Sequence, residues 1–66
     1  QSELEYVRRA LDELPDKTRE IFTLVRIEGL TYREAAEQLG ISDSSVQKHV
    51  ARAIAHVMKR MRESRS

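Results

Sequence analysis

Three serines in the second half of the chain are the residues that most resemble a catalytic group. Ser42, Ser44 and Ser45 gather three hydroxyls within four positions, which is a candidate source of a nucleophile. A serine nucleophile needs a histidine and a carboxylate arranged to activate it, and the sequence offers no such arrangement. We therefore interpret the serines as a helix cap and as small residues that permit close approach, and we expect no enzymatic activity.

The sequence also gives no support for a metal site. His49 and His56 are seven residues apart, whereas a helical two-histidine site prefers the i and i+4 positions, and no suitable carboxylate pair joins them. The chain has no cysteine, which excludes disulfides and thiolate metal sites. We expect no metal and no cofactor, and we expect a structural or phosphate-contacting role for His49.

Charge is unevenly distributed along the 66 residues, although the net charge is only +1. Residues 1–43 carry a net charge of −4, and residues 44–66 carry +5. A small domain with one basic end favours an anionic partner. The alternative explanation is a solvated last helix whose basic residues complement the negative end of its dipole.

The elements that must position these residues are predicted to be four helices, with no strand. The first helix ends before Pro15, which suits the first turn of the second helix. The second closes near Gly29, and the third opens with a capping box formed by Thr31 and Glu34. Ser42 is the expected N-cap of a fourth helix that continues to about residue 62, with residues 63–66 fraying. The apolar face of the first helix comprises Leu4, Val7, Leu11 and Leu14.

Residues 31–52 have the layout of a helix-turn-helix, which lies toward the C-terminus of this small all-α domain and has no winged elements. Gly40 supplies the backbone freedom of the turn, and Ala36 is small where the second helix crosses the first. One side of the last helix is apolar, and the other mixes small residues with long polar ones, as a helix in the major groove requires. That second side comprises Ser44, Lys48, Ala51, Arg52, Ala55, Lys59 and Arg62.

The chain as a whole resembles region 4 of bacterial sigma-70-family factors, and in particular the extracytoplasmic-function branch. The matching features are LP followed by REIF, then EGLTYREAAEQLGIS, then SVQKHVARA. The KHVARA version is also similar to the iron-uptake, cell-surface-signalling subgroup. The resemblance implies recognition of the promoter −35 element in the cytoplasm by a domain attached to RNA polymerase core, with an anti-sigma factor as a further partner.

The resemblance also implies which residues contact DNA. Positions of the last helix that read bases in the family correspond to Gln47, Lys48, Ala51 and Arg52, with Ser44 and Ser45 near the backbone. Family positions that touch phosphate correspond to Thr31, Tyr32 and Arg33. Family members often carry larger side chains where Gln47 and Ala51 stand, so their base preference does not transfer to this chain.

We expect a single domain over residues 1–66 that is a fragment of a longer protein, because the chain begins with Gln1 and lacks the family's region 2. Two alternatives stay open. The first is a LuxR-type response-regulator DNA-binding domain, against which the LP and REIF motifs and the long last helix argue. The second is a protein-interaction module that uses apolar surface around Val57, Met58 and Met61. Membrane insertion is not expected, since no apolar run approaches the roughly 18 residues of a spanning helix.

Overall fold

The computed structural model describes residues 3–64, and within this range the chain forms helices and no strand. The helices are α1 (Glu3–Asp12), α2 (Asp16–Phe22), its π-helical continuation η1 (Thr23–Ile27), α3 (Tyr32–Leu39) and α4 (Asp43–Ser64). The predicted all-α, four-helix fold is confirmed. Helix α4 extends beyond the predicted end, so the expected fraying is wrong for Glu63 and Ser64; for residues 65 and 66 it lies outside the described range.

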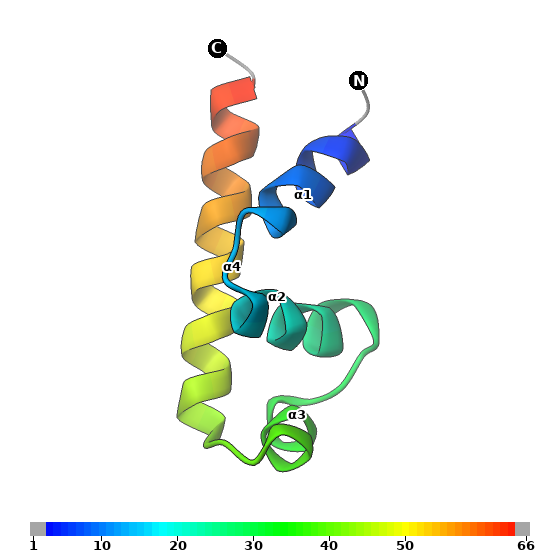
Figure 1. Cartoon of the computed structure of the whole chain (residues 1–66), viewed down its shortest axis with the longest axis vertical. Coiled ribbons are helices and arrows are strands. Elements are labelled where there is room, and N and C mark those ends of the chain that lie inside the picture. The colour runs from blue at the N-terminus through cyan, green and yellow to red at the C-terminus, as the bar shows by residue number, and fades with distance from the viewer. Residues whose placement is uncertain (1–2, 65–66) are drawn as a thin grey trace.

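Helix α4 is the long axis of the molecule, and the other helices pack along it (Figure 1). With 22 residues it is roughly 33 Å long at the usual helical rise, within a molecule that measures 39 × 18 × 17 Å. Figure 1 shows α3 at the N-terminal end of α4, α2 near its middle and α1 beside its C-terminal half. Helices α1, α2 and α3 are therefore each oriented by contact with α4, whereas η1 packs against α2 and α3.

The main core joins α2, η1, α3 and the first half of α4. Ile21, Val46 and Val50 are fully buried at its centre, and smaller or partly buried residues surround them. Ala36 is 3% exposed where α3 lies against α4, which confirms that a small residue stands at this crossing. The remaining buried members of the cluster are Leu24 and Ala35.

Helix α1 is held to α4 mainly at its C-terminal end. Ala10, Leu14 and Ala53 are buried there, but Leu4 is 77% exposed. The expectation that Leu4 lies on the buried face is therefore wrong. Figure 1 gives the reason: α1 leans away from α4 toward its own N-terminus, so the first turn has no neighbour to bury it.

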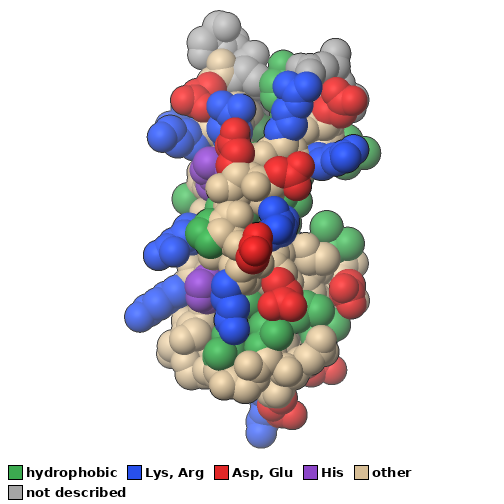
Figure 2. All heavy atoms as spheres, viewed as in Figure 1, with side chains coloured by type: hydrophobic (Ala, Val, Ile, Leu, Met, Phe, Trp, Pro, Cys, Tyr) green, Lys and Arg blue, Asp and Glu red, His purple; other side chains and the backbone are tan. Residues whose placement is uncertain are grey.

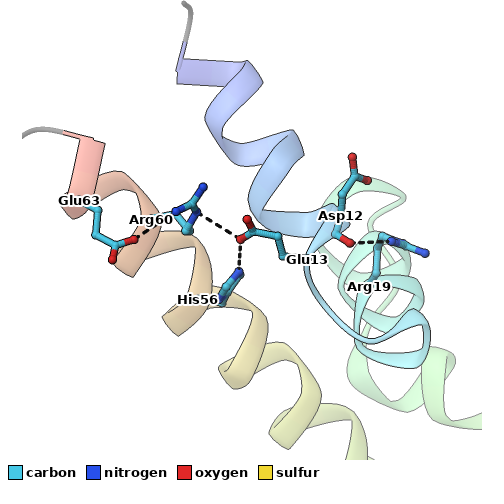
Figure 3. Close-up of polar contacts among 6 residues, drawn as sticks. All are labelled: Asp12, Glu13, Arg19, His56, Arg60 and Glu63. Atoms are coloured by element: carbon cyan, nitrogen blue, oxygen red, sulfur yellow. Dashed lines mark hydrogen bonds and ion pairs between the residues drawn. The ribbon is translucent and has the colours of Figure 1, made fainter.

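Polar contacts reinforce the attachment of α1 (Figure 3). The Glu13 carboxylate lies 2.9 Å from Nε2 of His56 and 3.2 Å from Nε of Arg60, and Arg60 also reaches Glu63 at 3.3 Å. On the other side, Arg19 donates to the backbone carbonyl of Asp12 at 3.4 Å. These groups are partly exposed, so each pair contributes on the order of 1 kcal/mol or less.

The start of the second helix differs from the sequence expectation, whereas its predicted close near Gly29 is confirmed. Pro15 occupies the N-cap position with φ −55° and ψ 146°, one residue before the first turn in which it was expected, because this ψ is extended and not helical. The helix ends in a wider turn in which the Glu28 amide donates to the Thr23 carbonyl. Thr23 opens this turn, and its hydroxyl donates to the Arg19 carbonyl, a back-bond that often bends a helix. Gly29 then adopts φ +84°.

Candidate nucleic-acid interface

The start of α3 is fixed by the predicted capping box. The Glu34 amide donates to the Thr31 hydroxyl at 3.0 Å, and the Thr31 amide donates to the Glu34 carboxylate at 2.9 Å. Hydrogen bonds to the Glu34 carboxylate, first from the Thr31 backbone amide and second from the Thr31 side chain, lower the pKa of Glu34 below its ordinary value, because both favour the charged form. These hydrogen bonds fix the first turn of α3 relative to Thr31, the residue that precedes the helix.

The three phosphate candidates from the sequence lie together at this end of α3. The Thr31 hydroxyl accepts from the Glu34 amide at the N-terminus of α3, and Thr31 is exposed there. Tyr32 is half-buried with its ring packed against the core, which suits a side chain whose tip alone meets a ligand. Arg33 is exposed and 3.4 Å from Glu37, a weak surface pair that a phosphate can displace.

A left-handed glycine and a serine cap bring α4 close behind α3. Gly40 adopts φ +69°, and the next amide, of Ile41, donates back to the Ala36 carbonyl. The Ser42 hydroxyl then accepts from the Ser45 amide at 3.1 Å, so the predicted N-cap is confirmed. The Ser42 hydroxyl donates in turn to the Ser45 hydroxyl at 3.1 Å. The helix-turn-helix predicted for residues 31–52 is therefore present in the backbone.

Helix α4 presents two different sides over its first three turns. Val46, Val50 and Ala53 are almost fully buried. The candidate base-reading residues all lie on the exposed side, together with one of the two backbone-contact serines, whereas Ser45 is half-buried on the flank. The exposed candidates are Ser44, Gln47, Lys48, Ala51 and Arg52.

The cations on this side are not neutralised by neighbouring acids. Within residues 3–64, neither Lys48 nor Arg52 forms an ion pair, whereas Arg60, farther along α4, is bound to Glu13 and Glu63. Figure 2 shows Lys and Arg side chains projecting along the edge of the molecule that α4 forms. The N-terminal half of α4 therefore carries positive charge that an anionic partner can use in full.

One interaction at this site was not expected from the sequence. Oγ1 of Thr18 in α2 and Nδ1 of His49 in α4 are hydrogen-bonded at 2.9 Å, and Thr18 is completely buried. The two residues are 31 positions apart. In the sequence, a threonine on the inner face of α2, three residues before Ile21, indicates a buried hydrogen bond, but the sequence does not identify the partner.

An apolar groove between α1 and η1 was also missed. It has a volume of about 380 Å³ and includes Leu4, Val7, Leu11 and Ile27 in its lining. Ile27 is 65% exposed although it continues the apolar pattern of the second helix. One wall of the groove is α1, which lies toward the opposite end of α4 from α3 (Figure 1), whereas the other wall includes η1, which packs against α3.

Among the side chains that the structure describes, no three histidine, aspartate or glutamate residues are grouped closely enough to hold a metal ion. None of the helices described is both long and apolar enough to cross a bilayer.

Comparison with known proteins agrees with the resemblance read from the motifs. The family described as "Sigma-70, region 4" matches residues 4–57. The ferric citrate uptake sigma factor FecI of Escherichia coli K12 is 49% identical over 55 residues, which cover 83% of this chain but 32% of that protein. No solved structure matches. The family match decides between the two DNA-binding families considered above, and the chain belongs to the sigma-70 region 4 family.

Proposed function

We propose that this chain is the region 4 domain of an extracytoplasmic-function sigma factor and binds the −35 element of promoters during transcription initiation. The relative's name, an iron-citrate uptake sigma factor, supports assignment to the iron-uptake, cell-surface-signalling subgroup. The chain spans about a third of that relative, so the remaining steps of initiation belong to other parts of a whole sigma factor. Its partners are then promoter DNA, RNA polymerase core and an anti-sigma factor, in the cytoplasm.

The observation that carries this proposal is the exposed side of α4, where unpaired Lys48 and Arg52 stand among small residues. Ser44 and Ala51 leave room for base edges to approach, while Gln47 and Arg52 supply amide and guanidinium donors. Thr31, Tyr32 and Arg33 at the start of α3 then serve as phosphate contacts that fix the register of α4, with Ser45 beside the backbone.

The experiment is a selection of duplexes by the 66-residue chain from a pool randomised over a −35-length window. Bound and unbound fractions are sequenced at low and at physiological salt. We expect a short motif to be enriched, and we expect affinity to fall steeply with salt, because phosphate contacts release counterions. Salt-sensitive binding without enrichment would contradict sequence reading, and absence of binding at both salt concentrations would contradict the proposal as a whole.

The role of Arg52 is tested on the enriched duplex. If Arg52 reads a base, Arg52→Ala costs about 1–3 kcal/mol on this duplex and less on a scrambled one. Lys59→Ala is the matched control, because Lys59 is also exposed on α4 but lies about 10 Å farther along the helix axis. Equal losses on enriched and scrambled DNA would reduce Arg52 to a phosphate contact.

A second role, protein binding, is favoured by the apolar groove between α1 and η1. Leu4 and Ile27 expose most of their side chains there, and Arg8, Asp12 and Arg19 also line the groove and provide charged groups. We assign this groove to RNA polymerase core. Ile27→Glu is expected to abolish binding to purified polymerase core and to leave DNA binding by the chain unchanged. Retained binding to the core, or a parallel loss of DNA binding, would contradict the assignment.

A further inference from the structure

His49 occupies the border between the core and the exposed side of α4. It follows Lys48 directly and lies one helical turn before Arg52, in the same row as Ser45 one turn earlier. Its side chain is half-buried. Arg52 is therefore its neighbour on the helix surface, and Lys48 is the residue before it in the chain.

The hydrogen-bond partners of Thr18 determine which nitrogen of His49 carries the proton. Thr18 is 0% exposed, and in the described part of the chain its hydroxyl has one hydrogen bond, to Nδ1 of His49 at 2.9 Å. A buried hydroxyl whose hydrogen has no acceptor is destabilising by about 1–3 kcal/mol. The Thr18 hydroxyl must therefore donate and Nδ1 must accept. In the neutral imidazole, the proton is then on Nε2.

The Nε2–H group has no partner in the protein and is open to solvent. Every buried side-chain nitrogen or oxygen in residues 4–63, whose side chains the structure describes, has a hydrogen-bond partner. His49 makes only the bond from Nδ1 to Thr18, and no other partner for its ring is present in that range. Nε2 therefore cannot be a buried atom. Nε2–H of His49 is therefore a donor of fixed orientation that lies at the edge of the exposed side of α4 and has no acceptor in the described part of the chain.

We propose that His49 is a DNA-backbone contact, in which Nε2–H donates to a phosphate oxygen while Thr18 holds the ring in the required tautomer and orientation. The proposal rests on the proposed function of α4. A phosphate suits this donor because neighbouring Lys48 and Arg52 attract the polyanion, and a neutral donor adds directionality to their charge. Thr18 is then a positioning residue in α2. Through its hydrogen bond to His49, the packing of α2 against α4 affects DNA binding.

The first test reads the tautomer directly, by NMR of the His49 ring nitrogens in the 66-residue chain at a pH of about 8, where an ordinary histidine is neutral. We expect a protonated Nε2 and an unprotonated Nδ1. In Thr18→Val, which keeps the shape of the side chain and removes the hydroxyl, we expect the Nδ1 resonance to move to the position of a nitrogen without a hydrogen bond. A protonated Nδ1 in the unmodified chain would overturn the proposal.

The second test measures affinity for the enriched duplex and for a scrambled duplex over a range of salt. The double variant Thr18→Val/His49→Phe removes both polar partners together, so no hydroxyl is left unsatisfied and the fold is retained. We expect it to bind both duplexes roughly tenfold more weakly, as for one lost hydrogen bond to a charged acceptor. The slope of log affinity against log salt is expected to stay unchanged, because no charge is removed. His49→Gln, which offers an N–H at a similar distance from the backbone, is expected to recover part of the loss.

The control is His56→Phe, the same substitution two turns along α4, where the ring faces Glu13. It is expected to leave DNA affinity unchanged. Normal binding by the double variant, or an equal loss in the control, would overturn the role of His49 and leave the proposed function intact. Absence of DNA binding by the unmodified chain would overturn both.

Discussion

The charge of the exposed side of α4 makes a quantitative prediction about salt. Lys48→Gln and Arg52→Gln together remove two cations and keep long polar side chains that favour a helix. Both residues are exposed and make no ion pair in the described range, so the substitutions break no contact and should leave the fold unchanged. The assay is fluorescence anisotropy with a labelled duplex at several salt concentrations.

The expected magnitude follows from counterion release. Each phosphate neutralised by a lysine or arginine contributes about −0.9 to the slope of log affinity against log salt. If Lys48 and Arg52 each neutralise one phosphate, the double variant has a slope shallower by about 1.8. Between about 50 and 200 mM salt, the unmodified chain then loses about twelvefold more of its affinity than the variant does. If Arg52 reads only a base edge, the change in slope is about half as large.

Arg60→Gln is the matched control on the same helix. Arg60 is eight residues beyond Arg52, roughly 12 Å along the axis, which exceeds the screening length of about 10 Å at 0.1 M salt. Its guanidinium already pairs with Glu13 and Glu63. We expect its removal to leave the slope unchanged. A slope that is unaffected by the double variant would refute contact by α4, and equal flattening by Arg60→Gln would refute a localised contact.

Three further predictions concern the parts that hold this surface in place. Gly40→Ala should lower the free energy of unfolding by about 1–2 kcal/mol, because φ is +69° at this position while a Cβ there meets nothing within 4 Å, so the cost is conformational and not steric. In chemical denaturation, Gly40→Asn should lower the free energy of unfolding by less. Equal losses in the two variants would contradict a purely conformational cost. Glu34→Gln should remove a stabilising contribution that is present above the ordinary glutamate pKa and is lost as pH falls through the lowered pKa of the folded state. The free energies of unfolding of the unmodified chain and of Glu34→Gln should therefore converge in acid. A difference that stays constant with pH would exclude the Glu34 carboxylate as the source of the stabilisation. Glu13→Gln should cost less than about 1 kcal/mol in unfolding free energy and leave DNA affinity unchanged, whereas a large loss of affinity would place the end of α1 within the DNA interface.

The helix boundaries near the site were predictable because their signals are local. The capping box from Thr31 to Glu34 spans four residues, and Ser42 caps the helix that begins at the next position. Gly40 stands where an L-residue with a side chain would be strained. Each of these signals acts within one helical turn, so sequence spacing alone determines the outcome.

What the sequence could not predict depends on how separate helices meet. The exposure of Leu4 follows from the angle at which α1 leaves α4 (Figure 1), and periodicity cannot supply that angle. The bonds from Thr18 to His49 and from Glu13 to His56 join residues 31 and 43 positions apart. The wider turn that begins at Thr23 depends on a change of hydrogen-bond register, for which the apolar pattern gives no sign.

The arrangement of α4 explains why this domain would act as part of a larger assembly. Its buried side shares the core with α2 and α3 through Val46 and Val50, so the reading side is rigid and loses little entropy on binding. Over its first three turns, that side has two cations without an ion pair in the described range, Lys48 and Arg52, and a few neutral donors, which limits the affinity of the domain alone. On the proposed function, attachment to RNA polymerase through the groove between α1 and η1 would raise the effective concentration of α4 at the promoter without any new DNA contact. Sequence preference can then come from α4, while most of the binding free energy comes from the rest of the complex.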